Sequence, residues 1–264
     1  MTVNISRITT ATSAALQTEN NAVSETNIDD TLLTIGLRTN AGQQTVSRQS
    51  VERGIGVEDT TLEDLLRAYS VSLDTKLINQ ATNGLTNVAT SVAYTDGTPT
   101  AAELYPKVVG AIAAVEAALL DSDPNATVAL MHSRRWYWLQ SQLTSTWPLF
   151  GQPGVGSQQG GVNYGAVYGS GFRGLLPNGT AVIVDNNIAT NLGAGTNEDE
   201  IYLVSKDEAY LWEDPQAPML IRAEQTKAAS LGVLLVVYGY YGYTYVRRSH
   251  AQKVAGTGLV TPTF

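Results

Sequence analysis

The sequence has no cysteine and only two histidines among its 264 residues. Without thiols, the chain can form no disulfide framework, no thiolate zinc site and no cysteine nucleophile. His132 lies next to Ser133, but adjacent residues rarely have the geometry of a base and its nucleophile, and no orienting acid is evident. Ser133 is better explained as the residue that caps the start of a helix.

Charged residues are also scarce. They make up 15% of the chain, whereas a soluble domain usually carries about 25%, so we expect another molecule to cover part of the surface. The 24 acidic residues outnumber the 16 basic residues and leave a net charge of -8, which argues against a general nucleic-acid-binding protein. The segment after Glu224 has no acid and carries Lys227, Arg247, Arg248 and Lys253. We interpret it as an ordinary solvated or subunit-facing segment.

The longest apolar run, residues 231–246, is shorter than the roughly 18 to 20 residues that a transmembrane helix needs. Three glycines interrupt it among several tyrosines, which favours a long buried β-strand over a helix. The first fifteen residues lack the basic start and the continuous apolar core of a signal peptide. We therefore expect neither a membrane span in this run nor export by that route.

The first fifty residues are rich in Thr, Asn, Ser and Gln and alternate polar and apolar residues over short stretches such as residues 31–38. This pattern predicts extended hairpin strands with one face partly covered. A two-stranded hairpin has no compact core and is marginal on its own in water. The arm therefore needs a partner.

A dominant helix is predicted after this arm. Thr60 and Glu63 spell a capping box, and apolar residues recur at helical spacing from Leu62 to Ala81. The helix is expected to end near Gly84, where glycine can adopt the left-handed conformation that stops a helix.

Thr100 and Glu103 repeat the capping-box spelling and predict a second helix to about Leu120, with a start as late as Pro106 also compatible with the sequence. The glycine-rich segment 151–174 is expected to be a long surface loop. Further strands are predicted at residues 127–131, 180–185, 201–205, 208–212 and 219–224. The fold class is therefore α+β with one dominant helix.

Acidic residues in the second half of the chain are the candidates for a catalytic carboxylate pair or a calcium site. They are Glu198, Asp199, Glu200, Asp207, Glu208, Glu213 and Asp214. Adjacent residues of a strand point to opposite faces, so no doublet forms a facing pair by itself, and we interpret these acids as solvated turns. Residues 169–174 spell a dinucleotide fingerprint but lack the strand before it and the helix after it. We predict no cofactor, no metal and no catalytic residue.

Few charges, an extended arm, a long helix and no convergent reactive groups favour a structural building block. Two other classes stay open. A carboxylate-dependent, glycosidase-like hydrolase would use the 198–214 region and would lose activity in a Glu200→Gln or Glu213→Gln variant. A secreted β-rich binding module would be a stable monomer with affinity for a ligand.

The order of several segments carries a family resemblance. These segments are residues 13–20 with Glu25 and Thr26, residues 46–49, the predicted helix of residues 60–81, residues 131–136 and residues 174–188. In this order the chain resembles the major capsid proteins of tailed bacteriophages with the HK97 fold. The similarity covers nearly the whole chain by segment order.

The resemblance implies an HK97-like capsid fold of the α+β class, with an extended β-hairpin loop, a long spine helix, and peripheral and axial domains. The implied ranges are 1–47 for the extended loop (E-loop), 48–97 for the peripheral domain with the spine helix at about 60–82, 98–200 for the axial domain, 201–246 for returning peripheral strands, and 247–264 for the return to the axial domain.

The resemblance also implies a structural protein, not an enzyme, that self-assembles through hexamers and pentamers into an icosahedral shell enclosing double-stranded phage DNA. Such a protein resides in the virion capsid, is assembled in the host cytoplasm and contacts the packaged DNA only non-specifically. Separate scaffolding, portal and decoration proteins are further candidate partners, and no membrane partner is expected.

Charged residues of the arm are expected to meet residues of neighbouring copies and to fix register more than affinity. The expected intersubunit residues are Glu19, Asn20, Glu25, Asp29, Asp30, Arg38, Arg48, Arg53, Arg222, Glu224 and Lys227. A chain that lacks residues 14–45 is expected to fold but not to assemble.

Two departures from the family pattern are evident. Family members often have an N-terminal arm, whereas here almost nothing precedes the hairpin, so a truncated chain or a separate scaffold is expected. Some relatives join the extended loop to a neighbour through a lysine–asparagine isopeptide bond, but the first lysine here is Lys76. We therefore predict a monomer band, without a covalent ladder, on denaturing gels.

Overall fold

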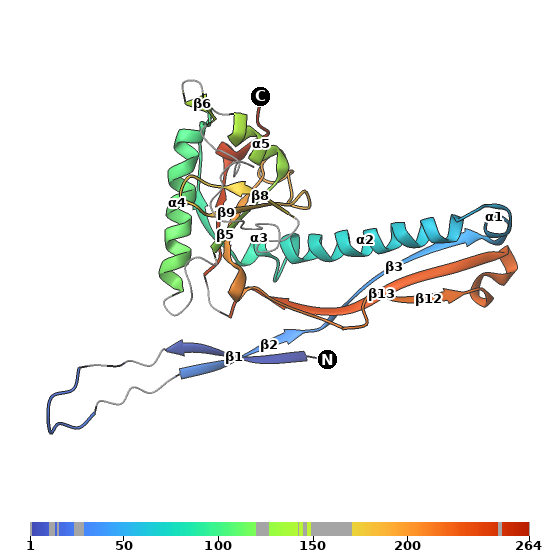
Figure 1. Cartoon of the computed structure of the whole chain (residues 1–264), viewed down its shortest axis with the longest axis horizontal. Helices are drawn as coiled ribbons and strands as arrows, with labels where there is room; N and C mark the ends of the chain where they lie inside the picture. Colours follow the sequence, from blue (N-terminus) through green and yellow to red (C-terminus); the bar gives the residue numbers. More distant parts are fainter. Residues whose placement is uncertain are drawn as a thin grey trace, which may run out of the picture.

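The computed structural model describes residues 2–10, 14, 16–23, 29–119, 127–141, 143–144, 147–148, 171–247 and 250–263. Figure 1 shows a compact lobe, a long arm formed by α2 and the strands beside it, and a β1–β2 hairpin that projects from the base of the arm. The α+β class is confirmed. In chain order the elements are β1 (Thr2–Thr10), β2 (Asp29–Gly36), β3 (Arg38–Ser47), α1 (Arg48–Arg53), α2 (Val57–Asn79), α3 (Leu85–Val88), β4 (Thr90–Ala93), α4 (Ala101–Ala118), β5 (Thr127–Met131), α5 (Ser133–Ser141), β6 (Leu143–Thr144), β7 (Trp147–Pro148), β8 (Phe172–Leu175), β9 (Ala181–Val184), β10 (Ile201–Ser205), the 3-10 helix η2 (Lys206–Glu208), β11 (Tyr210–Glu213), β12 (Met219–Ala223), the 3-10 helix η3 (Gln225–Ser230), β13 (Gly232–Thr244), β14 (Gln252–Ala255) and the 3-10 helix η4 (Thr257–Leu259).

The lobe is built on a six-stranded sheet with the order β4-β14-β10-β5-β9-β8. All five residues of β10 are buried, because β10 lies in the middle of the sheet and both of its faces are covered. On one face, Val115 of α4, Trp136 of α5 and Leu203 of β10 belong to the largest apolar cluster. The sheet draws strands from residues 90–93 and 201–205 as well as from the range 98–200. Most of the expected glycine-rich loop lies outside the described residues.

Helix α4 begins as its sequence predicts. The Thr100 hydroxyl accepts a hydrogen bond from the Glu103 N–H at 3.3 Å, and the Glu103 carboxylate accepts one from the Thr100 N–H at 3.3 Å. The capping box is confirmed, and the helix starts at Ala101 with Pro106 inside it. It ends at Ala118, two residues before the expected end.

Helix α2 does not begin at the capping box that its sequence spells. Its first residue is Val57, and the residue before it, Gly56, has a positive φ of 74°. Thr60 therefore lies inside the helix, where its hydroxyl donates to the Gly56 carbonyl at 2.9 Å. A threonine in the first turns can bond back to a carbonyl four residues earlier, so the spelling alone does not identify the cap.

The predicted end of α2 near Gly84 is also wrong, because the helix ends at Asn79. Gly84 has φ -65°, not a left-handed conformation, and precedes α3. A Cβ at this position would collide with the backbone of Gln80 and Ile78. Glycine is therefore needed here for a close backbone approach.

The arm contains a four-stranded sheet around β13, which confirms the long strand expected in residues 231–246. β13 pairs antiparallel with β3 from Gly232↔Ser47 to Tyr241↔Arg38, and with β11 and β12 on its other side. Val233 and Leu235 are buried on the face covered by α2, together with Val46 of β3. Alternate residues of β13 point to the opposite face.

The hairpin is the third part of the molecule. β1 and β2 pair antiparallel from Thr2↔Gly36 to Thr10↔Asp29, and Leu37 separates β2 from β3. The extended strands expected in the first fifty residues are confirmed, and the third of them, β3, joins the arm sheet. Gly242 allows the base of the hairpin to approach β13, because a Cβ there would lie 2.8 Å from Leu37 Cδ2.

Helix α5 is capped by His132 and not by Ser133. The His132 Nδ1 accepts the Arg134 N–H at 3.1 Å, and the His132 carbonyl accepts the N–H groups of Arg135 and Trp136. Ser133 is the first helical residue, so the expected cap was wrong by one position. Burial, and then the charge of Arg134, lower the pKa of His132, which keeps Nδ1 available as an acceptor.

Candidate intersubunit surfaces

The far end of the arm carries a group of charged side chains that we call the tip cluster. It comprises Arg48, Glu52, Glu58, Arg222 and Glu224. Arg48 binds Glu52 at 2.9 Å and Glu224 at 3.5 Å. Arg222 binds both Glu58 and Glu224. The cluster thus ties together α1, the first turn of α2, β12 and the residue before η3 (Figure 1).

The tip cluster lies at the surface. The hydrogen bond that Arg48 donates to Glu52, followed by the charge of Glu224, raises the pKa of Arg48, and the hydrogen bonds that Arg222 donates to Glu58 and Glu224 raise the pKa of Arg222. Exposed ion pairs contribute little to the stability of a fold. Three carboxylates against two guanidinium groups leave a local acidic excess, so this cluster is more suited to setting register with a partner than to holding the monomer together.

The tip cluster contains three of the residues expected from sequence. Arg48, Arg222 and Glu224 come together within one chain, although Arg48 and Arg222 were expected to meet acidic residues of the N-terminal hairpin of neighbouring copies. The sequence analysis missed Glu52 and Glu58. The four-residue spacing from Arg48 is a signal for Glu52. No local signal identifies Glu58, because its partner Arg222 is 164 positions away in the chain.

The other expected residues do not form one site. Glu19 and Asn20 are exposed in the loop between β1 and β2, and Glu25 lies outside the described residues. Asp30 accepts a hydrogen bond from the Ser6 hydroxyl at 3.0 Å, and Asp29 begins β2 beside it. Of the remaining three, Arg38 lies at the start of β3 near Tyr241 and Tyr243. Arg53 at the end of α1 and Lys227 in η3 are both exposed.

One face of the arm sheet is apolar and faces away from α2. Alternate residues of β13 and β12 line it, and both Ile221 and Tyr240 are 46% exposed. Beside Tyr240, a cavity of about 810 Å³ opens between the base of the hairpin and β11, lined by Val3, Leu37 and Trp212 among others. Apolar surface of this kind on a charge-poor chain marks an interaction surface.

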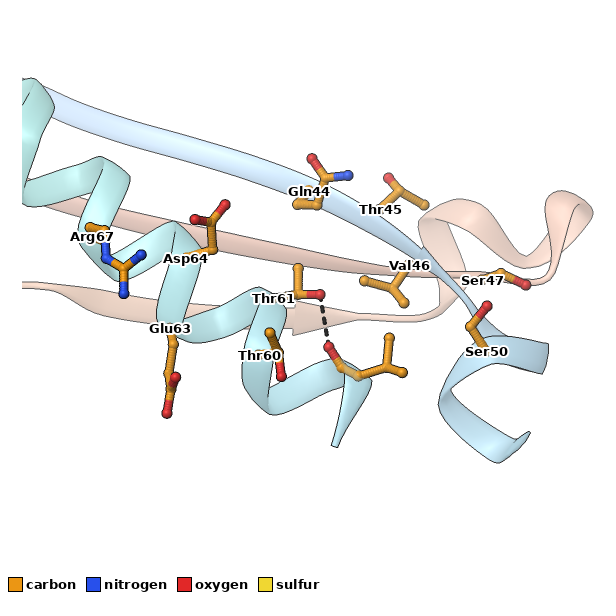
Figure 2. Close-up of a pocket in the computed structure, with 11 residues that line it drawn as sticks. Gln44, Thr45, Val46, Ser47, Ser50, Thr60, Thr61, Glu63, Asp64 and Arg67 are labelled. Carbon is orange, nitrogen blue, oxygen red and sulfur yellow. Dashed lines mark hydrogen bonds between the residues drawn. The ribbon is translucent and has the colours of Figure 1, made fainter. Parts of the chain in front are cut away.

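A second, polar groove lies between β3 and the first turns of α2. Its volume is about 660 Å³. Figure 2 shows Thr61 and Asp64 of α2 on one side and Gln44 and Thr45 of β3 on the other, with Arg67 further along the helix. The groove has carboxylate, hydroxyl and amide groups but no convergent catalytic arrangement.

The acidic residues considered for catalysis are engaged in structural contacts. Asp199 is fully buried and pairs with Arg134 at 2.6 Å and Arg135 at 3.1 Å. Glu200 is buried and binds Lys253 at 2.8 Å and the Tyr202 hydroxyl at 2.7 Å. The interpretation as solvated turns was therefore wrong for both, because a basic side chain from elsewhere in the fold compensates each buried charge.

In the next two doublets only Glu208 is buried, whereas Asp207 and Glu213 are exposed as expected. Glu208 is buried and pairs with Arg247 at 3.5 Å, while Asp207 beside it is exposed. The Tyr69 hydroxyl donates to Glu213 at 2.9 Å. Two of the basic residues after Glu224 therefore have acidic partners within the chain, because Arg247 pairs with Glu208 and Lys253 pairs with Glu200.

The described part of the chain lacks two features. Its His, Asp and Glu residues form no group of three or more that could hold a metal ion. Among the same residues, no helix is long and apolar enough to cross a membrane.

Comparison with known proteins identifies the family. The family model described as phage capsid protein matches residues 30–254. The chain belongs to the phage capsid protein family. This match covers the tip cluster, the arm sheet, α2 and most of the lobe.

Solved capsid structures have the same fold at low identity. A capsid structure of a native GTA particle is 13% identical with a TM-score of 0.68, covering 97% of this chain and 84% of that one. The structure from Gordonia phage Cozz is 12% identical with a TM-score of 0.63, covering 96% of this chain and 81% of that one. The structure from Mycobacterium phage Bobi is 14% identical with a TM-score of 0.64, covering 97% of this chain and 85% of that one. A search of curated proteins returns no match. The HK97-like fold expected from the resemblance is confirmed.

The family and the fold together assign the chain as a structural major capsid protein of a bacteriophage shell. They support a self-assembling protein located in the virion capsid. The hydrolase and the secreted binding module are not favoured by these comparisons.

Proposed function

We propose that this capsid protein assembles as hexamers and pentamers into an icosahedral shell around double-stranded phage DNA, and that its β1–β2 hairpin lies on a neighbouring copy. The shell has no catalytic task, and assembly takes place in the host cytoplasm. Scaffolding, portal and decoration proteins are the expected accessory partners. The net charge of -8 suits a container that must not hold phosphate tightly.

The single observation that supports this role best is that the hairpin has no covering layer beyond its base, where Ile35 is buried. Val3, Ile5 and Leu33 lie on one of its faces and are half-buried, while Leu32 on the other face is 69% exposed. An isolated two-stranded sheet is marginally stable in water. Packing on another copy would bury this apolar surface, and closed symmetry would multiply many weak contacts.

The domain division that we propose follows the sheets. The extended loop comprises β1 and β2, the peripheral domain comprises the arm with α2 as the spine helix, and the axial domain comprises the lobe. The charged residues of the hairpin, Glu19, Asp29 and Asp30, and those of the tip cluster are the proposed contacts between copies.

Removal of residues 2–36 tests the role of the hairpin. The deletion expected from sequence, residues 14–45, is unsuitable because it would remove most of β3, which pairs with β13. The shorter deletion keeps the arm sheet, so the variant is expected to stay folded by circular dichroism and to sediment as a monomer. Light scattering that shows shells of normal size from this variant would contradict the proposed role of the hairpin.

A further inference from the structure

The strand β3 is an edge strand with none of the usual protection. In the described part of the chain it pairs only with β13, and Ala41 to Thr45 are all exposed. Natural proteins blunt exposed edges with lysine, proline, bulges or short strands. β3 runs for ten residues with the sequence RTNAGQQTVS and an unbroken register, and Arg38 at its start is its one charged residue. The unpaired edge of β3 can therefore form backbone hydrogen bonds with another strand.

The register shows which backbone groups of β3 are available. The Arg48 N–H donates to the Leu231 carbonyl at 2.8 Å, and this pair continues the register of Ser47↔Gly232. Antiparallel residues alternate between groups that point toward the partner strand and groups that point away. The N–H and C=O groups of Ala41, Gln43 and Thr45 therefore point away from β13.

The groove beside this edge favours a strand without acidic residues. Figure 2 shows the Asp64 carboxylate pointing toward β3, with Glu63 at the outer rim and Arg67 as the one cation among the lining residues. An incoming strand with carboxylates would be repelled, and a strand with a basic residue would be attracted.

We propose that the free edge of β3 binds strand β1 of a second copy of the chain through backbone hydrogen bonds along this groove. This inference rests on the proposed function and names the surface that receives the hairpin. Among the described residues β1 pairs on one side only, with β2, and its nine residues match the ten of β3. Its one charged residue is Arg7, whereas β2 begins with Asp29 and Asp30. Charge complementarity therefore selects β1.

The contact would remove two unpaired edges at once. The hairpin would become part of a larger sheet, which has the three or more strands that independent stability requires. Backbone pairing of this kind gives affinity with little dependence on side chains.

Proline at position 43 tests the backbone contact. Proline removes the outward N–H of Gln43 but no hydrogen bond to β13, and proline is tolerated on the open side of an edge strand. A Gln43→Pro variant is expected to melt like the wild type as a monomer but to associate at least about tenfold more weakly, which corresponds to 1.4 kcal/mol. The matched control, Gln43→Ala, keeps the N–H and is expected to assemble normally.

Disulfide trapping tests the identity of the partner strand, and the absence of native cysteine makes the readout clean. One preparation carries Gln43→Cys, and a second carries Asn4→Cys or Ser6→Cys to cover neighbouring registers. Mixed, assembled and oxidised, the two preparations are expected to give a dimer band on non-reducing denaturing gels, because adjacent strands bring Cα atoms within disulfide range.

The inference is overturned if Gln43→Pro assembles like Gln43→Ala, or if position 43 forms a disulfide with neither position 4 nor position 6. The deletion of residues 2–36 separates this failure from failure of the proposed function. If the deletion abolishes assembly while no β1–β3 link forms, the hairpin acts at a different surface. If the deleted chain assembles normally, the proposed role of the hairpin is itself wrong.

Discussion

Asp199 is a buried carboxylate that binds two arginines of the lobe. It accepts from Arg134 and Arg135, and Arg135 also donates to the Val260 carbonyl at 2.7 Å and stacks on Trp138 at 5.1 Å. Burial, opposed by the charge of Asp199, lowers the pKa of Arg135. The guanidinium group remains acceptable in the core only because this carboxylate compensates it.

We predict that Asp199→Asn lowers the free energy of unfolding by about 3 kcal/mol, because it leaves a buried cation without its anion. Urea denaturation of the monomer measures the change. Asp207→Asn, at an exposed neighbouring acid, is the control and is expected to change stability by less than about 0.5 kcal/mol. Equal effects of the two substitutions would show that the Asp199 contacts do not stabilise the fold.

Asp185 and Asp74 form the second residue-scale feature, where the lobe meets α2. Asn187 links the two, since its side chain donates to Asp74 at 2.7 Å and its N–H donates to Asp185 at 2.8 Å. Burial first, and then the charge of Asp74 and a hydrogen bond to it, raise the pKa of Asp185 to about 6. Tyr245 is a further titratable group near these two carboxylates. Burial first, and then the charges of Tyr243, Asp74 and Asp185, raise the pKa of Tyr245.

A raised carboxyl pKa makes the fold bind its proton more tightly than the unfolded chain does. Its stabilising contribution is therefore complete below the unfolded value of 3.8 and is lost as the pH rises to about 6. We predict a loss on the order of 1–2 kcal/mol across this interval, because the site is partly open to solvent. Urea midpoints measured from pH 4 to 7 should show this slope in the wild type and a flatter profile in Asp185→Asn. An unchanged profile would contradict the assignment.

At the scale of elements, the two Thr-x-x-Glu segments give a matched comparison. Thr100 and Glu103 form a reciprocal cap at α4, whereas Thr60 lies inside α2. We predict that Thr100→Ala costs about 1 kcal/mol of stability. Thr60→Ala should cost less than about 0.5 kcal/mol, since an exposed bond to the Gly56 carbonyl is all that it loses. Thermal unfolding of both variants measures these changes. A loss of stability from Thr60→Ala larger than about 0.5 kcal/mol would show that Thr60 and Glu63 do cap a helix.

These two helices also show what can be predicted from sequence. Local signals located α2, α4, β5, β9, β10 and β13, because periodicity and capping depend on neighbouring residues. They failed where a distant contact decides the outcome, as at Gly84, which must let the chain pass close to Gln80. The buried pairs of Asp199 and Glu200 likewise depend on Arg134, Arg135 and Lys253, and no local pattern reports those distances.

The intersubunit residues expected from the family resemblance stay predictions. Three of them, Arg48, Arg222 and Glu224, lie together at the tip of the arm within one chain. Glu58 and the free edge of β3 could not be found without the topology. Whether a strand is central or at an edge depends on which partner strand the fold supplies.

At the scale of the whole molecule, the described residues divide between a lobe with a large core and two extended parts with a small core or none. Nineteen of the described residues form the main buried cluster of the lobe, whereas the buried members of the small cluster under α2 are Val46, Val233 and Leu235. The hairpin has no covering layer beyond its base, where Ile35 is buried. We propose that assembly supplies the contacts that the arm and the hairpin lack in the monomer.

Hydrogen–deuterium exchange of the dilute monomer and of the assembled shell tests this account most directly. We predict rapid exchange of the β1, β2 and outward β3 amides in the monomer, slow exchange of the β5 and β10 amides in both states, and protection of the hairpin and the β3 edge in the shell. A monomer whose hairpin amides are already as protected as those of β10, and which forms no particles on concentration, would contradict the account.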